Sequence, residues 1–103
     1  MVCVVHTFSV IDDTDWDSAV AACKQMWDYE KRVFGQQMTF MRATTGDTSR
    51  VMVMGFFESK EAHDEYAKRE KEDPDFKALF EAAKKASAGV LADAGTEFYR
   101  VVE

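Results

Sequence analysis

The sequence predicts an α+β fold in which helices cover one face of a four-stranded antiparallel sheet. Apolar, β-rich runs lie near both ends and in the middle of the 103-residue chain, as expected for strands. Two stretches between them carry apolar side chains at three-to-four spacing, which is typical of helices packed on one side. The resulting order, strand-helix-strand-strand-helix-strand, is the ferredoxin-like split βαβ arrangement. The length predicts one such domain over residues 1–103.

Composition and charge argue against several classes of function. Hydrophobic residues make up 47% and charged residues 31% of the chain, which is ordinary for a globular domain. The formal net charge of −6 argues against binding nucleic acid or an anionic membrane, because both need a basic face. No run approaches the roughly 18 apolar residues of a membrane span, and the N-terminus is predicted to be a strand rather than a signal peptide. We therefore expect a cytoplasmic protein, with Cys3 and Cys23 as buried free thiols.

The first strand and the first helix are predicted over the N-terminal third of the chain. Val2–Val10 is apolar and β-rich, so it is predicted to be a strand. A helix follows with Thr14 as its N-cap and with Asp17 in the first turn, where the helix dipole favours an acid. Gly35 stands where a helix commonly ends. The apolar stripe of this helix comprises Trp16, Val20, Cys23, Trp27 and Phe34.

A hairpin and a charged helix are predicted next. Residues 36–44 and 50–57 are predicted strands, joined by a turn cluster at residues 45–49. Ser59 is a suitable cap for a helix over residues 60–71. The exposed face of this helix has acid-first pairs in the favourable order, Asp64–Lys68 and Glu65–Arg69.

A second helical segment and a last strand complete the predicted fold. Asp73 suits an N-cap and Pro74 suits the first helical position of a segment that ends near Ser87. Its apolar stripe is Phe76, Leu79, Phe80 and Ala83. Two glycines, Gly89 and Gly95, bracket the exit from this helix, and residues 96–102 are the predicted last strand.

Both faces of the predicted sheet are apolar. The first strand places His6 and Phe8 on one face and Cys3 and Val5 on the other, and the remaining strands alternate in the same way. A sheet with helices on one side should be polar on its bare side, and a large apolar face usually marks an interaction site. The simplest arrangement is a homodimer with two sheets packed face to face about a two-fold axis. A pocket covered by loops is the alternative.

Residues 51–80 carry a local pattern that is similar to a known superfamily. A strand ends in FFESKEA (residues 56–62), a charged helix follows, and DPDF (residues 73–76) opens the next segment. With the order of elements over nearly the whole chain, this pattern resembles the dimeric α+β barrel superfamily. That superfamily includes antibiotic-biosynthesis-type monooxygenases, haem-degrading monooxygenases and NIPSNAP-like proteins. The resemblance implies a homodimer around a shared β-barrel, with a cavity in each subunit between sheet and helices; function inferred from it is analogy.

The residues that haem-degrading relatives use do not carry over to this chain. Phe57 stands where those relatives have a Trp, and Phe80 stands where they have a His on the helical region. A phenylalanine cannot ligate iron, and the Asn of their first strand has no clear counterpart here. These departures argue strongly against haem degradation and moderately against the related oxygenase chemistry, and we expect no cofactor. The chain also has no HxH or HExxH spacing, so no metal site is expected.

Four residues are the candidate ligand-binding positions. His6 lies in the middle of an apolar strand, where an imidazole that titrates near neutral pH is a candidate general base, or else a structural histidine. Arg42 and Arg100 share the parity of His6 within their strands and would bind an anionic group if the register brings them together; the alternative is that each pairs with an acid. Met54 belongs to a methionine cluster that indicates either a pliable pocket or core and dimer interface.

Three functions are consistent with these observations. The first is a dimeric barrel that binds a small, mainly apolar ligand between sheet and helices. The second is a cofactor-independent monooxygenase acting on an aromatic substrate, with His6 as the candidate catalytic residue. The third is a purely structural or interaction dimer, which predicts a filled barrel and no convergence of His6, Arg42 and Arg100.

Overall fold

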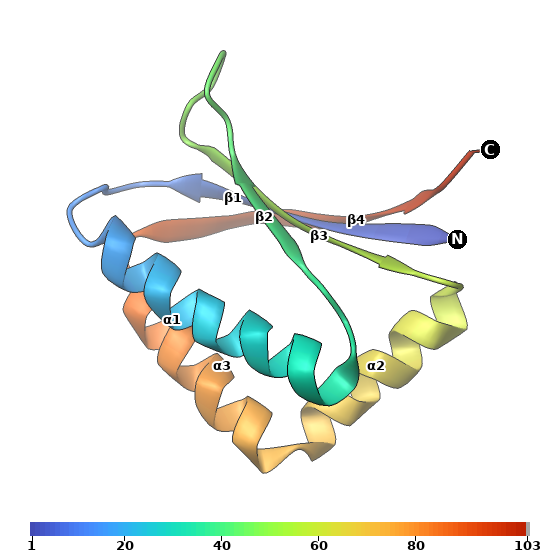
Figure 1. Cartoon of the computed structure of the whole chain (residues 1–103). Helices are drawn as coiled ribbons and strands as arrows, with labels where there is room; N and C mark the ends of the chain where they lie inside the picture. The colour runs from blue at the N-terminus through green and yellow to red at the C-terminus, as the bar shows by residue number, and fades with distance from the viewer. Residues whose placement is uncertain (103) are drawn as a thin grey trace.

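All helices lie on one face of a single four-stranded sheet, and the opposite face carries no helix (Figure 1). The computed structural model describes residues 1–102. The strands are antiparallel to their neighbours and have the order β2-β3-β1-β4. The predicted ferredoxin-like α+β fold is therefore confirmed. The elements are β1 (Val2–Val10), α1 (Trp16–Tyr29), a π-helical segment η1 (Glu30–Phe34), β2 (Thr39–Arg42), β3 (Arg50–Phe57), α2 (Lys60–Glu72), α3 (Pro74–Ser87) and β4 (Leu91–Arg100).

The two central strands supply the core beneath the helices. His6 of β1 pairs with Val53 of β3, so every second residue on either side of this pair faces the helices. Val4 and Val51 are the largest side chains that are fully buried there. Burial of this face against α1 and α3 is the main apolar contact of the fold.

The first helix begins later than the sequence predicts and ends in an unusual way. Thr14 was the predicted N-cap, but its backbone N–H donates to the Asp12 carboxylate at 2.9 Å. This turn delays the helix, so Asp15 holds the N-cap position and α1 begins at Trp16. At the other end, Glu30 opens a π-helical turn, and Gly35 then ends the helix with a φ of 72°, as predicted for this position.

Two strand boundaries differ from the prediction. Strand β2 covers Thr39–Arg42 instead of residues 36–44. Before this strand, the Gln36 side chain donates to the Phe56 carbonyl. The Met38 sulfur lies so close to Gly55 that a β-carbon there would be 2.5 Å from it. Residues 36–38 therefore pack across β3 and do not extend the hairpin.

Strand β4 is also different, because it covers Leu91–Arg100 instead of residues 96–102. The register between β1 and β4 shifts between Thr7 and Phe8, which leaves Ala94 unpaired as a β-bulge. Gly95 takes a φ of 117° there, a conformation that favours glycine. The glycine that was expected to mark the entry to the strand therefore lies inside it.

The break between α2 and α3 follows the predicted chemistry. Ser59 caps α2 by accepting from the Ala62 N–H at 3.1 Å. Asp73 caps α3 by accepting from the Asp75 and Phe76 N–H groups, with Pro74 in the first turn. The predicted partner of Asp64 was Lys68, but Asp64 pairs with Lys60 one turn earlier, at 2.5 Å.

The face of the sheet without helices is apolar along the central strands. Val5 of β1 pairs with Met54 of β3 on this face, and Met54 in turn pairs with Thr39 of β2. Three large side chains of this face are about half exposed, Met41 at 40%, Phe56 at 50% and Tyr99 at 48%. No helix within the described residues has the length and hydropathy needed to cross a membrane.

Candidate functional site

A cavity of about 670 Å³ lies between the helix-covered face of the sheet and the helices. It meets solvent between α3 and β4, because the exposed residues of its lining, such as Phe80, Lys84 and Asp93, belong to these two elements. Its other end is closed by residues of η1 and α2. The lining comprises His6, Phe8, Cys23, Met26, Trp27, Glu30, Met38, Phe40, Val53, Tyr66, Glu70, Phe76, Phe80, Ala83, Lys84, Ser87, Ala88, Leu91 and Asp93.

Aromatic rings form much of the cavity wall. Phe40 of β2 and Trp27 of α1 both line the cavity, with ring centroids 5.0 Å apart, and the Trp16 ring lies outside the lining, 5.7 Å from Phe40. On the α3 side, the rings of Phe76 and Phe80 stack at 6.2 Å. Flat rings on two sides suit a planar aromatic ligand, which would offset-stack on them. The tryptophans thus pack helix against sheet, as the apolar stripe of α1 predicts.

His6 lies on the sheet side of the cavity. Its Nδ1 is hydrogen-bonded to the Thr96 hydroxyl at 2.9 Å. Partial burial lowers the pKa of His6 below its usual value, and repulsion from His63 lowers it further. The imidazole is therefore neutral at neutral pH, and in the tautomer in which Nδ1–H donates to the Thr96 hydroxyl, Nε2 is free to accept a proton.

The bulge in β4 places two polar residues beside His6. Without the unpaired Ala94, the alternation along β4 would put Asp93 and Thr96 on opposite faces of the sheet. With it, Asp93 pairs with Phe8 and Thr96 pairs with His6, so both lie on the helix-covered face. This arrangement depends on pairing between distant segments and is not visible in the sequence of β4 alone.

The closed end of the cavity holds a pair of carboxyl groups, which we call the carboxyl pair: Glu30 of η1 and Glu70 of α2. Glu30 is only 3% exposed. Burial raises the pKa of Glu30 to about 9, and the hydrogen bond and charge of Glu70 contribute to this rise. Burial also raises the pKa of Glu70. At neutral pH Glu30 therefore holds a proton that it donates to Glu70, and this hydrogen bond favours the ionised form of Glu70.

Tyr66 places an unpartnered hydroxyl next to the carboxyl pair along α2. Its ring packs against Phe57 and Phe34, with centroids 5.2 Å and 5.9 Å away. The hydroxyl oxygen is buried and has no hydrogen-bond partner among residues 1–102. A buried polar group without a partner is uncommon and costs about 1–3 kcal/mol. Tyr66 and Glu70 are four residues apart on one helix face, so both face this end of the cavity.

The structure separates the four predicted ligand-binding residues. His6, Arg42 and Arg100 share one face of the sheet. Along the strands, however, Arg42 lies in the same row of paired residues as Phe8, whereas Arg100 pairs with Val2. Six residues of strand span about 20 Å, so the two arginines lie near opposite ends of the sheet and do not converge with His6.

Three of the four predicted positions, Arg42, Met54 and Arg100, lie outside the cavity. Arg42 pairs with Asp13 at 2.6 Å and lies over the Trp16 ring at 4.7 Å, the acid-paired alternative of the sequence prediction. Met54 lies on the other face of the sheet and does not line the cavity. Of the four candidates, only His6 lines it.

Sequence reasoning did not single out the carboxyl pair, although a signal was present. Glu30 lies three residues after Trp27 and four before Phe34, so it interrupts the apolar stripe of the first helix. An acid in a buried stripe is costly unless it is paired, and this makes it a candidate functional residue. Within residues 1–102 no group of three His, Cys, Asp or Glu side chains is arranged to hold a metal ion.

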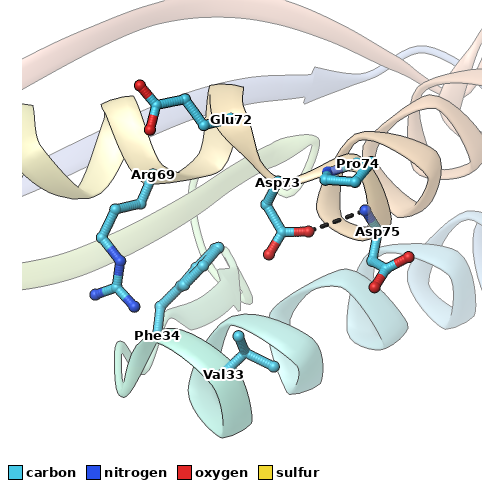
Figure 2. A pocket seen from close by; sticks show the side chains of 7 residues that line it. All are labelled: Val33, Phe34, Arg69, Glu72, Asp73, Pro74 and Asp75. Atoms are coloured by element: carbon cyan, nitrogen blue, oxygen red, sulfur yellow. Dashed lines mark hydrogen bonds between the residues drawn. The ribbon is translucent and has the colours of Figure 1, made fainter.

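A second hollow, of about 480 Å³, lies at the surface where α2 breaks into α3. Figure 2 shows its lining, with Phe34 and Val33 below and the Asp73 carboxylate turned to the Asp75 N–H. Asp73 also accepts from the Tyr29 hydroxyl at 2.7 Å, and Arg69 lies over the Phe34 ring at 4.8 Å. These groups already join helices to one another, so we assign the hollow a structural role.

The comparisons with known proteins identify the fold. No protein-family model matches the sequence, and no curated protein matches it. A mutant of SnoaB, a cofactor-independent oxygenase from Streptomyces nogalater, matches with a TM-score of 0.68 at 13% identity, over 99% of this chain and 93% of that one.

Two further solved structures are similar. A protein from Nitrosomonas europaea assigned to the antibiotic biosynthesis monooxygenases matches with a TM-score of 0.67 at 10% identity, over the full length of both chains. A NIPSNAP family protein from Agrobacterium tumefaciens matches with a TM-score of 0.66 at 14% identity, over 96% of this chain and 90% of that one. The fold expected from the resemblance is thus confirmed, and at such identities the similarity extends to the fold alone.

Proposed function

We propose that the protein binds a small, mainly apolar molecule with an aromatic body in the cavity beneath the sheet. The observation that carries the proposal is the cavity itself. Its volume of about 670 Å³ lies within the range of roughly 300–1,000 Å³ that is typical of small-molecule sites. Its aromatic walls supply apolar contact, and its polar groups lie at His6, at the closed end and at the mouth. A purely structural dimer agrees with the separation of Arg42 and Arg100 from His6, but it gives no role to a cavity of this size.

The proposal predicts that filling the cavity abolishes binding. Val53 is 5% exposed and lines the cavity from the centre of the sheet. In Val53→Phe a ring would occupy ligand space, so we expect the affinity for 1-naphthylmethanol, measured by isothermal titration calorimetry, to fall at least about tenfold, or 1.4 kcal/mol. Met52→Phe makes a similar change on the same strand but on the other face, and it should bind as the wild type does. Equal binding by both variants, or none by the wild type, would refute the proposed site.

A second candidate function is oxygenation of an electron-rich aromatic without a cofactor. The observation that favours it is His6, a neutral imidazole on the cavity wall with one nitrogen fixed by Thr96. A ring CH₂ activated by neighbouring carbonyl or phenol groups would lose a proton to His6, and the carbanion would reduce O₂. The overall reaction, R₂CH₂ + O₂ → R₂C=O + H₂O, takes all its electrons from the substrate. SnoaB shows that the fold can carry such an activity, although the analogy is one of fold.

This candidate predicts oxygen consumption that depends on His6. With anthrone and quinol-type substrates, His6→Ala should lower the rate of oxygen uptake at least about 100-fold, because general-base catalysis contributes roughly 10²–10⁴. His63→Ala is the matched control, since His63 packs against Phe57 and Phe98 and does not line the cavity. If wild type and His6→Ala consume oxygen at equal rates, His6 has no part in the chemistry, and the binding function stands without it.

A further inference from the structure

We propose that the cavity selects ligands that carry a protonated amine on their aromatic body, with the ammonium group held by the carboxyl pair and the Tyr66 hydroxyl. This inference rests on the proposed binding function and specifies the ligand class. Three observations support it: the charge of the pair has no cation, the acceptors match an ammonium group in number, and the remaining charges of the cavity cancel.

The carboxyl pair lacks a cationic partner. The ion pairs of the described residues join Arg42 to Asp13 and Asp64 to Lys60 and His63, and none includes Glu30 or Glu70. Buried charges in proteins are ordinarily paired, because taking an unpaired carboxylate out of water is costly. Here a shared proton takes the place of the cation. A ligand ammonium would supply the missing positive charge at the position where the structure already concentrates negative charge.

The acceptors at the closed end match the donors of a primary ammonium group. Such a group has three N–H donors and no acceptor. Glu30 and Glu70 each offer carboxyl oxygens, and the Tyr66 oxygen has no hydrogen-bond partner within the part of the chain that the structure describes. The three groups come from two elements, η1 and α2, that meet at this end of the cavity. Binding would therefore satisfy the Tyr66 hydroxyl as well as the charge.

The surrounding rings and the other charges favour the same ligand. Phe76 lines the same cavity, and an aromatic face attracts a cation. The remaining ionic groups of the lining are Lys84 and Asp93 near the mouth, with opposite charges, while His6 is neutral. The carboxyl pair thus determines the sign of the charge that the closed end accepts, and an anionic ligand would be repelled there.

Three probes of one size and shape test the inference: 1-naphthylmethylamine, which is protonated at pH 7, neutral 1-naphthylmethanol, and anionic 1-naphthoate. We expect the wild type to bind the amine at least about tenfold more tightly than the alcohol, and the naphthoate most weakly, by calorimetric titration. In the double variant Glu30→Gln/Glu70→Gln, the preference for amine over alcohol should fall to within about twofold. Glu72→Gln changes an exposed acid on the same helix and should keep the full preference.

The outcomes separate the inference from the function on which it rests. Tight binding of the alcohol without preference for the amine would overturn the inference and leave the binding function standing. A preference that survives in the double variant would also overturn it, because the ammonium would then be held elsewhere. Failure of all three probes to bind would refute both. Tyr66→Phe removes only the hydroxyl, and it should lower the amine preference about threefold while alcohol binding is unchanged, which tests the assignment if the double variant does not fold.

Discussion

Replacing Glu30 by glutamine should stabilise the protein at alkaline pH by an amount that grows as the pH rises. We expect the free energy of unfolding of Glu30→Gln, relative to wild type, to increase by about 2 kcal/mol between pH 7 and pH 9. The glutamine side chain has nearly the same shape as the protonated acid and can still donate to Glu70. The expected gain therefore comes from removing a titration and not from new contacts.

The sign follows from the direction of the pKa shift. Burial raises the pKa of Glu30 from 4.5 to about 9. Between these values the folded chain holds a proton that the unfolded chain has lost, so the free energy of unfolding of the wild type falls with rising pH. The contribution of protonated Glu30 to stability is complete below the pKa of this residue in the unfolded chain. It is lost as the pH rises through the pKa of Glu30 in the folded chain. One linked proton corresponds to at most about 1.4 kcal/mol per pH unit.

Urea unfolding of both proteins at pH 7, 8 and 9 measures this effect. The pKa of His6 is lowered from its usual value. Its titration therefore changes the free energy of unfolding only at pH values below the range of 7 to 9. Burial raises the pKa values of Cys3 and Cys23, but both thiols are present in both proteins and cancel in the difference. Glu72→Gln, an exposed acid on α2, should give a difference that does not change with pH. A constant difference for Glu30→Gln as well would show that Glu30 is already ionised at pH 7.

The sequence predicts the elements whose ends are determined by neighbouring residues. Ser59, Asp73 and Pro74 act within one helical turn of their own position, and the boundaries of α2 and α3 agree with prediction. Gly35 likewise ends the first helical region where expected. Local chemistry of this kind is visible in the chain before it folds.

The remaining features depend on partners that are distant in sequence. The start of β2 is determined by packing of Met38 over Gly55, and the bulge of β4 by its register with β1. The candidate site has the same origin. His6 was recognised because a histidine in an apolar strand is unusual, whereas the meeting of Glu30 with Glu70 depends on η1 contacting α2, forty residues further along the chain. The alternation of side chains along each strand correctly predicts that Arg42 and Arg100 share the face of His6. It does not predict how far from His6 they lie along the strand direction, because that depends on the register.

We propose that the protein is a homodimer, and in that case replacing Met54 by glutamate should convert the dimer into a monomer. The apolar face of the sheet without helices supports the proposal that two copies pack through it, about a two-fold axis. Met54 lies on central strand β3, opposite Val5 and Thr39. In an isologous interface one substitution introduces two charges, and each would be buried without a partner. We expect the dissociation constant of the dimer to rise at least about 100-fold, or 2.7 kcal/mol.

Sedimentation velocity over a range of concentrations, with native mass spectrometry, measures the change. Val33→Glu is the matched control: Val33 is 44% exposed on η1, on the helix-covered side, so this variant should remain dimeric. A monomeric wild type, or a dimeric Met54→Glu, would show that the open face has another role.

Met54→Glu also tests whether the cavity is complete within one chain. The lining residues described above come from the other face of the sheet and from the helices that cover it. A monomeric Met54→Glu should therefore bind 1-naphthylmethanol with an affinity within about threefold of the wild-type dimer, because the substituted face does not reach the cavity. If the variant loses both the dimer and ligand binding, packing of the two sheets against each other is needed to shape the cavity on the opposite face of each sheet. Retained binding would separate the two faces of the sheet by role, one for assembly and the other for the ligand.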